Sequence, residues 1–323
     1  MTGTVAVVGA GPAGLMAARR CVERGLGVTV FDKGRRPGGR TNTREHAEHR
    51  FDHGAQYFTV RDDRTRPFLE GWLESGVVEE WAGRLVRLGI DSLVPARESR
   101  RYVGVPGMIA LPMHLARGLD VRCGVRVERL ERSGGMWRLS DDEGHDLGVY
   151  AHVIVAVPAP QAVPLLAAVP ALQSESRRRS MAPCWAAMFA FEEPIESDFD
   201  GAFVQDAPIS WIARDTSKPG RPDGARWVTH ATPEWTTAHW DLDRGVVAQM
   251  LALELERLLG PLPERTFERA HRWGYALAGD PAPGVLHDVT AGIAVAGDWT
   301  LGGRIEGAIL SGLEAAELIL PNS

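Results

Sequence analysis

The stretch TVAVVGAGPAGLMAARRCVERGLGVTVFDK, residues 4–33, decides the fold class. An apolar run enters a glycine-rich turn and a helical pattern follows, with Pro12 suited to the first turn of a helix and Gly25 placed to end it. A second apolar run, residues 26–33, then returns as a strand. This order predicts a βαβ unit with a right-handed crossover, and therefore a parallel sheet.

The turn of this unit carries the spacing G-x-G-x-x-G in the form Gly9, Gly11 and Gly14. The first glycine permits the tight turn, the second lets the backbone approach a pyrophosphate, and the third allows close packing of helix on strand. Pro12 and Ala13 begin the helix whose free N–H groups would face the phosphates. Asp32 ends the second strand, where an acid can accept a hydrogen bond from a ribose hydroxyl. Together these residues predict a dinucleotide site.

The segments after Asp32 distinguish a flavin from a nicotinamide cofactor. A second glycine motif, RRPGGR at residues 35–40, follows the acid, and FDHGAQYF comes soon after at residues 51–58. In this order the two segments resemble the flavin-containing amine oxidase superfamily. The resemblance implies an α/β protein with a Rossmann-like FAD-binding domain of the glutathione reductase and p-hydroxybenzoate hydroxylase type. An inserted α+β substrate domain of mixed antiparallel sheet and helices would complete it.

Near the C-terminus, a buried-strand pattern ends in an aspartate and breaks into glycines, in AVAGDWTLGGRIEGAILSG at residues 294–312. A buried carboxylate is unfavourable unless it is hydrogen-bonded. The resemblance implies that Asp298 accepts a hydrogen bond from a phosphate or ribityl hydroxyl. The small residues that follow predict a closely packed helix, 306–319, whose N-terminus would point at the N1–C2=O edge of the flavin. Such a helix dipole contributes about 0.3–2 kcal/mol.

The same resemblance distributes the cofactor contacts along the chain. Arg40 would lie along the pyrophosphate, Gly54 to Gln56 would pass the flavin, and the backbone at Val127 would hold the adenine. The predicted contacts are Gly9, Gly11, Pro12, Ala13, Gly14, Asp32, Lys33, Arg40, Gly54, Ala55, Gln56, Val127, Gly297, Asp298, Arg304, Glu306, Gly307 and Ala308. Since no cysteine lies near the C-terminal flavin segment, we expect the FAD to be noncovalent.

Strand and helix patterns predict two domains, one of them discontinuous. Parallel-sheet segments at both ends of the chain surround a β-rich middle with one clear helix, residues 244–260. The predicted FAD-binding domain comprises residues 1–59, 102–160 and 285–323. The predicted substrate-binding domain comprises residues 60–101 and 161–284.

Composition narrows the classes of partner. The chain is 44% hydrophobic and 24% charged with a net charge of −6, and no basic block predicts binding to nucleic acid or an anionic membrane. Four prolines interrupt the longest apolar stretch, residues 152–172, so it does not predict a regular spanning helix. The three cysteines have no metal-site spacing, and no secretory leader is evident. We expect a cytoplasmic monomer or weak homo-oligomer without a metal.

Two absences favour one kind of flavoenzyme. No second G-x-G-x-x-G follows the first, so electrons should come from a substrate lying on the flavin. Amine oxidases of the superfamily usually keep a lysine near flavin N5, but this chain has only Lys33 and Lys218. Lys33 adjoins the ribose-binding acid, and Lys218 lies in TSKPGRPDG, which we interpret as a polar loop. An amine substrate is therefore less expected than the superfamily name implies.

A narrower resemblance, to bacterial renalase-like proteins, covers nearly the whole chain. It is carried by GAGPAGL, FDKGRRPGGRTNTR, FDHGAQYFT, SWIARDTSKPGR, WVTHATPEWTTAHW, RWGYA and the C-terminal glycine segment. It implies oxidation of 2- and 6-dihydro isomers of NAD(P) by hydride transfer to flavin N5, with O2 as acceptor and H2O2 as product. Such substrates need positioning more than acid–base catalysis. The predicted substrate-side residues are Gln56, Tyr57, Trp211, His230, Trp235 and Arg304.

Alternatives from other classes stay open. An FAD-dependent oxidase or dehydrogenase acting on an amine or another small metabolite would share the fold. A protein that binds FAD without turnover would also share it, although the flavin-edge motifs argue against that class. A membrane-associated desaturase or protoporphyrinogen oxidase fits less well, because no apolar amphipathic anchor is visible.

Overall fold

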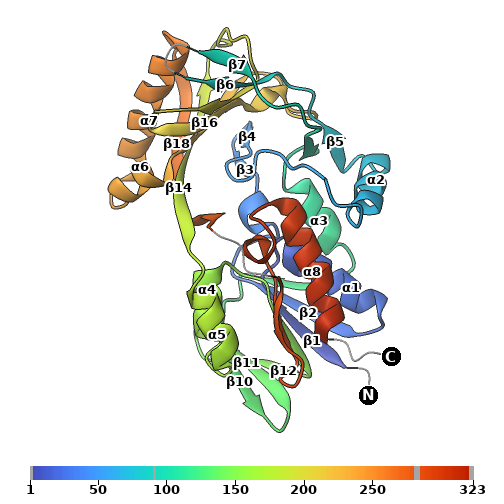
Figure 1. Cartoon of the computed structure of the whole chain (residues 1–323). Coiled ribbons are helices and arrows are strands. Elements are labelled where there is room, and N and C mark those ends of the chain that lie inside the picture. Colours follow the sequence, from blue (N-terminus) through green and yellow to red (C-terminus); the bar gives the residue numbers. More distant parts are fainter. Residues whose placement is uncertain (1–2, 90–91, 280–283, 320–323) are drawn as a thin grey trace.

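The chain, seen in a computed structural model that describes residues 3–89, 92–279 and 284–319, forms two lobes around two large sheets (Figure 1). The six-stranded sheet has the order β19-β20-β13-β1-β2-β9, and the seven-stranded sheet the order β18-β14-β17-β16-β15-β6-β7. The outermost residues of the predicted domains and two short internal stretches, 90–91 and 280–283, lie outside the described residues.

The six-stranded sheet confirms the predicted parallel βαβ unit. Its strands are β1 (Thr4–Val8), β2 (Gly27–Asp32), β9 (Asp120–Cys123), β13 (His152–Val155), β19 (Leu286–Asp288) and β20 (Ile293–Val295). Val7 of β1 pairs in parallel with Val30 of β2 on one side and with Ile154 of β13 on the other. Only the edge strand β19 is antiparallel to its neighbour among the strands described. Segments from both ends of the chain therefore meet in one sheet.

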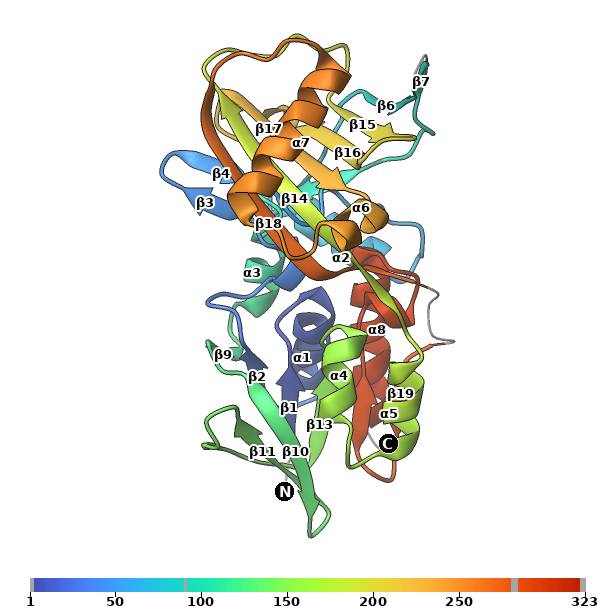
Figure 2. The ribbon, with the colours of Figure 1, turned by 90° about the vertical axis from the view of Figure 1, so that its left-hand side faces the viewer.

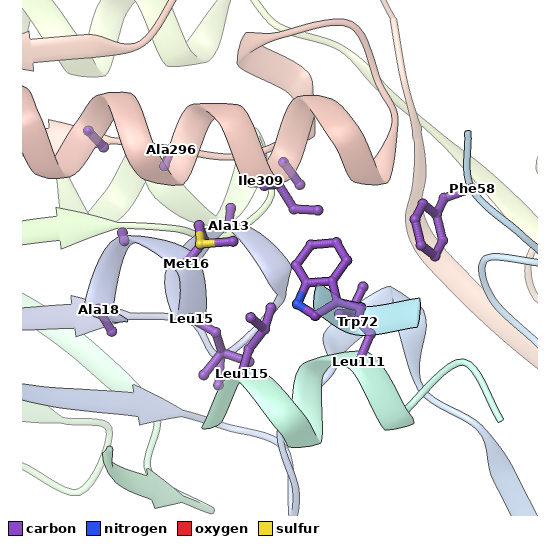
Figure 3. Close-up of a cluster of buried hydrophobic side chains, with 14 of the residues drawn as sticks. Ala13, Leu15, Met16, Ala18, Phe58, Trp72, Leu111, Leu115, Ala296 and Ile309 are labelled. Carbon is purple, nitrogen blue, oxygen red and sulfur yellow. The ribbon is translucent and has the colours of Figure 1, made fainter. Parts of the chain in front are cut away.

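Helices cover one face of this sheet. Because successive strand residues point to opposite faces, every second residue of a strand packs against these helices. Val5 and Val7 of β1 pack with α1 (Pro12–Glu23), α3 (Ala110–Ala116) and α8 (Ile305–Ile319). Figure 3 shows this core, in which Leu15, Leu111 and Ile309 come from the three helices. A Cβ atom at Gly312 of α8 would lie 2.2 Å from the carbonyl oxygen of Ala13, so the small residue lets α8 touch α1.

The other face of the sheet is covered by a small meander and two short helices. The meander is β10 (Val127–Ser133), β11 (Met136–Asp141) and β12 (Asp146–Tyr150), and the helices are α4 (Ala159–Leu165) and α5 (Pro170–Arg177). Ala162 of α4 and Leu172 of α5 belong to the same buried cluster as Ala6 of β1. The predicted domain boundary after residue 160 is therefore too early. Pro160 and Pro170 occupy first-turn positions, where proline is tolerated, whereas Pro164 lies inside the seven-residue helix α4.

The seven-stranded sheet forms the second lobe and is mixed, as predicted. Its strands are β6 (Leu85–Leu88), β7 (Leu93–Pro95), β14 (Met181–Phe191), β15 (Gly201–Val204), β16 (Ile209–Arg214), β17 (Ala225–Ala231) and β18 (Arg265–Ala278). Strands β15 and β6 are parallel, and the other neighbours are antiparallel. Helices α6 (Pro233–Ala238) and α7 (Arg244–Leu259) cover its outer face, and Figure 2 shows α7 in front of β14 and β17.

Segment 60–101 is divided between the two lobes. Helix α2 (Arg66–Glu74) and β5 (Val78–Glu80) contribute Leu69, Trp72 and Val78 to the α1–α8 core, whereas β6 and β7 join the seven-stranded sheet. β5 pairs with β8 (Tyr102–Gly104), and β3 (Arg44–His46) pairs with β4 (His49–Phe51). The predicted assignment of all of 60–101 to the substrate domain is therefore wrong for its first part, because its apolar side chains pack on the first lobe.

The described residues contain neither a membrane-spanning helix nor a cluster of metal ligands. No helix there combines the length and the hydrophobicity needed to cross a bilayer. No three His, Cys, Asp or Glu side chains in that part of the chain come together as metal ligands would.

Candidate active site

The glycine turn after β1 has room for a pyrophosphate. A Cβ atom at Gly9 (φ +112°) would lie 2.5 Å from the Ala156 carbonyl oxygen, and one at Gly14 would lie 1.9 Å from the Gly9 carbonyl oxygen, so packing explains these two glycines. At Gly11 nothing lies within 4 Å of the Cβ position. Gly11 is the N-cap of α1 and has no side chain that could accept from the first-turn N–H groups, so these groups are available to an anion. The turn therefore fits the phosphates of a dinucleotide.

Asp32 is held beside this turn. Its carboxylate oxygens accept hydrogen bonds from the backbone N–H groups of Ala10 and Gly34, each at 2.6 Å. The backbone N–H of Val125 donates to the Asp32 carbonyl at 3.0 Å, so the chain that leads to Val127 passes close to this acid. Lys33 is exposed. The residues predicted to bind the ribose and the adenine therefore lie close together, at the carboxyl end of β2.

Arg40 and Asp298, which lie far apart in the sequence, form a bidentate ion pair. Arg40 Nη1 donates to Asp298 Oδ2 at 3.0 Å, Nη2 donates to Oδ1, and Nη1 also donates to the carbonyl of Ala276 in β18 at 3.2 Å. The Asp298 side chain is 10% exposed, so the guanidinium compensates a nearly buried carboxylate. The contacts of both residues with FAD stay predictions.

The segment predicted to pass the flavin lies directly on the backbone of Arg40. The N–H of Ala55 donates to the Arg40 carbonyl at 2.9 Å. A Cβ atom at Gly54 would lie 2.0 Å from the same oxygen, so only glycine fits there. Gly54 and Ala55 are partly exposed, which leaves this strip of backbone open to a flat ring.

Several groups at the start of α8 form hydrogen bonds within the protein. The Glu306 carboxylate accepts hydrogen bonds from the N–H groups of Arg61 and Asp62 and from the Thr65 hydroxyl, at 2.6 to 2.9 Å. All three bonds go to Oε1, so Glu306 anchors loop 61–65 through this oxygen, and its contact with FAD stays a prediction. The Ala308 N–H donates to the Arg304 carbonyl, and the Arg304 side chain is exposed.

Two glycines of the C-terminal segment, Gly307 and Gly297, pack closely against neighbouring groups. A Cβ atom at Gly307 would lie 2.1 Å from the Leu301 carbonyl oxygen, and the N–H of Gly297 donates to the Ser311 hydroxyl at 2.9 Å. These contacts hold the glycine segment against α8.

Lys218 is fully buried, which corrects its interpretation as part of a polar loop. Its ammonium donates to Asp215 Oδ1 at 2.6 Å and to Gln56 Oε1 at 3.1 Å, and lies 3.5 Å from Asp52 Oδ2. Arg221, also buried, pairs with the same Asp52 carboxylate. We call these four ionic residues (Asp52, Asp215, Lys218 and Arg221) the buried ionic cluster. It has two charges of each sign.

The cluster fixes the electrostatics around Gln56. Burial alone would raise the pKa of Asp52, but the cations Lys218 and Arg221 outweigh burial and hold that pKa at about 2. The Gln56 amide donates to the carbonyl oxygens of Asp52 and Gly54 and accepts from Lys218. Gln56 therefore has a fixed side-chain orientation next to the flavin segment. The sequence signal for the cluster is the rarity of lysine, which does not reveal its partners.

The inner face of the seven-stranded sheet carries two of the predicted substrate-side residues. Trp211 of β16 and His230 of β17 are cross-strand neighbours, and the Trp211 and Tyr57 rings lie 5.8 Å apart. Trp235 does not join them. It lies in α6, stacks on His239 with ring centroids 4.0 Å apart, and packs with the cluster behind the sheet, so its prediction as a substrate-side residue is wrong.

Histidines that sequence analysis missed surround His230. His230 Nε2 lies 3.3 Å from the His53 carbonyl, which also accepts a hydrogen bond from the Trp273 indole, and the His53 ring packs on His271 and Trp273. Burial lowers the pKa of His53 to about 3, and that of His230 and His271 to about 4. All three imidazoles are therefore neutral at pH 7.

Comparisons with known proteins agree with this geometry. Residues 7–72 match the NAD(P)-binding Rossmann-like domain, and residues 86–320 match the flavin containing amine oxidoreductase family. Cyclohexylamine oxidase from Brevibacterium oxydans IH-35A has a similar fold, with a TM-score of 0.80 and 14% identity over 99% of both chains.

Two curated relatives are similar over shorter stretches. Phytoene desaturase (neurosporene-forming) from Rhodobacter capsulatus is 45% identical over 74 residues, which are 23% of this chain and 13% of the relative. Flavin-containing monooxygenase FMO GS-OX4 from Arabidopsis thaliana is 28% identical over 230 residues, 66% of this chain and 46% of the relative. The chain thus spans less than half the length of either relative. Because the family match covers most of the chain, this protein belongs to the flavin containing amine oxidoreductase family, and its cofactor is FAD.

Proposed function

We propose that this protein is a renalase-like oxidase that converts 2- and 6-dihydro isomers of NAD(P) to the aromatic cofactor and passes the electrons to O2. When bound, FAD would supply the two-electron chemistry that links the two half-reactions. The substrate loses a hydride and becomes aromatic, and O2 takes up these two electrons and two protons, one of them from solvent, to give H2O2. The observation that carries the proposal is the chemistry of the face opposite the flavin segment, which has aromatic rings and neutral imidazoles.

Among the described residues of this face, no side chain is suited to act as a general base. The imidazoles of His53 and His230 have pKa values of about 3 and 4, so they are weak bases. The Lys218 ammonium is surrounded by three acceptors, and Asp52 is held as a carboxylate by two cations. A dihydropyridine carries no N–H or O–H proton at the reacting ring, and its loss of hydride is favoured by aromatisation. Positioning is therefore the main requirement.

Aromatic side chains offer that positioning. The Tyr57 ring lies 5.8 Å from the Trp211 ring and 6.1 Å from the Trp81 ring, and the three side chains come from three separate segments. Flat faces of this kind pack well against a nicotinamide-sized ring. The nearby Arg101, which no described carboxylate pairs with, disfavours a substrate that carries an ammonium group.

The second candidate is an amine oxidase, which the family membership and the fold likeness to cyclohexylamine oxidase favour. It predicts reduction of the flavin by a primary amine. The two candidates therefore differ in the electron donor and share the cofactor.

Anaerobic mixing of the FAD-loaded protein with single electron donors tests the proposal. We expect 2- and 6-dihydro-NAD isomers to bleach the flavin absorbance rapidly, and cyclohexylamine, putrescine and ordinary 1,4-NADH to leave it nearly unchanged. Because His53 and His230 stay neutral, the rate constant of bleaching should be flat between about pH 6 and pH 8. Bleaching by an amine alone, or by none of these donors, would contradict the proposal.

A further inference from the structure

A small three-stranded ribbon separates two sets of side chains. Phe58 bridges Tyr102 of β8 through reciprocal backbone hydrogen bonds of 2.8 Å, and the N–H of Trp81 donates to the Arg101 carbonyl at 2.8 Å. Side chains alternate between the faces of such a ribbon. Phe58 and Tyr102 face α2, where Phe58 contacts Trp72.

The opposite face of the ribbon carries Tyr57, Trp81 and Arg101. The Arg101 guanidinium lies 5.6 Å from the centre of the Tyr57 ring, and the Lys218 ammonium lies 5.7 Å from the centre of the Trp81 ring. Trp211 of the seven-stranded sheet approaches the same Tyr57 ring. Arg101 is therefore on the side of the ribbon that faces the proposed substrate, next to a residue that directly follows the flavin segment.

Two buried donors beside Tyr57 have no acceptor. Arg101 donates through Nη1 to the Ser99 carbonyl and through Nη2 to the Arg97 carbonyl, but its buried Nε–H has no partner. Trp211 is 6% exposed as a residue, and its buried Nε1–H has no partner either. Buried N–H groups are nearly always hydrogen-bonded in folded proteins. Two such groups flanking one ring point to a ligand that brings hydrogen-bond acceptors.

The charge of Arg101 is not compensated by a carboxylate, unlike that of several nearby arginines. Arg64, Arg66 and Arg100 form ion pairs with Asp62, Asp63 and Glu80 respectively. Among the residues that the structure describes, no carboxylate pairs with Arg101. A guanidinium edge presents Nε–H beside an Nη N–H, a fork that matches the oxygens of a phosphate. In Arg101 both Nη groups already donate to backbone carbonyls, so Nε–H is the donor that lacks an acceptor. The missing acceptor is therefore best supplied by an anion.

We propose that Arg101, assisted by the Trp211 indole N–H, binds the diphosphate of a dinucleotide substrate beside Tyr57. The dinucleotide identity rests on the proposed function, whereas anion binding rests only on the unpaired donors and charge. Arg101 acts here as a specificity-determining residue: it selects a phosphate-bearing dihydronicotinamide over the corresponding riboside. It also disfavours a cationic amine at the same place.

The test compares FAD-loaded wild type with Arg101→Met and with Arg100→Met, an adjacent arginine on the other face that serves as the matched control. For 6-dihydro-NAD, Arg101→Met should raise KM by about 10- to 100-fold, the loss of one charge-assisted contact, with kcat little changed. The KM for 6-dihydronicotinamide riboside, which lacks the diphosphate, should stay the same. Arg100→Met should behave as wild type with both substrates. Equal effects on both substrates would indicate a structural role and overturn the inference.

A binding measurement separates this inference from the proposed function. Oxidised, FAD-loaded protein is titrated with ADP-ribose and with inorganic pyrophosphate while the flavin spectrum is followed. We expect binding to wild type and Arg100→Met, weaker binding to Trp211→Phe, and the weakest binding to Arg101→Met. If no dihydro isomer reduces the flavin but this order holds, the proposed function fails and the anion site stands. If neither anion binds wild type, or Arg101→Met binds both equally well, the anion site is wrong.

Discussion

Replacing Lys218 with methionine is expected to lower the free energy of unfolding by about 3–5 kcal/mol, because it leaves a buried carboxylate without its cation. Lys218 has fully buried contacts with Asp215, Gln56 and Asp52, and loss of Lys218 alone leaves the buried ionic cluster with one cation for two carboxylates. Chemical denaturation of the FAD-loaded variant and wild type, followed by circular dichroism, measures the difference.

Two controls make this result specific to the buried charge. Lys33→Met removes the only other lysine, which is exposed, and should change the free energy of unfolding by less than about 0.5 kcal/mol when both proteins are compared without FAD, since Lys33 is a predicted FAD contact. The double variant Lys218→Met/Asp215→Asn removes one charge of each sign and should recover part of the loss. A loss below about 1 kcal/mol in Lys218→Met would mean that the cluster is not held as an ion network.

The same cluster is expected to make the free energy of unfolding fall at acidic pH. The pKa of Asp52 is about 2 in the folded protein against an ordinary value of 3.8, because Lys218 and Arg221 outweigh the effect of burial. A carboxyl group with a depressed pKa contributes stability that is present above the ordinary pKa. This contribution is lost as the pH falls from 3.8 toward 2.

Replacing Asp298 with alanine is expected to weaken FAD binding by about 100-fold, equivalent to roughly 2.7 kcal/mol. The change removes the carboxylate predicted to meet a cofactor hydroxyl and leaves the Arg40 guanidinium without its bidentate partner. Titration of apoprotein with FAD, read by flavin fluorescence, measures the dissociation constant. Asp288→Ala, which removes a carboxylate that accepts from the Ala291 N–H in the edge strand, should bind FAD as wild type does. Full flavin content in Asp298→Ala would contradict the role given to this residue.

Local patterns predicted the parts of the fold that depend on neighbours in the sequence. The glycine turn, the βαβ unit and the terminal helix 305–319 all have short-range signals, such as first-turn prolines and small-residue spacing. The four prolines of residues 152–172 excluded a regular spanning helix, and the short helices α4 and α5 were not predicted. Prolines at first-turn positions are in fact compatible with short helices.

Long-range contacts explain the errors at the site. Lys218 lies in a polar segment, but its partners Asp52 and Gln56 are more than 160 positions away, so composition gives no sign that it is buried. Trp235 and Trp211 are both tryptophans of the β-rich region, yet they lie on opposite sides of one sheet. The contrast between Arg100 and Arg101 is set by ribbon register, which depends on the bridge between Phe58 and Tyr102.

Flavin content is the most direct test of the central claim that both ends of the chain hold one FAD. The purified protein should be yellow and carry about one FAD per chain, and acid precipitation should release that colour into the supernatant. Colourless protein that takes up no added FAD would contradict the claim, and colour retained in the pellet would contradict noncovalent binding.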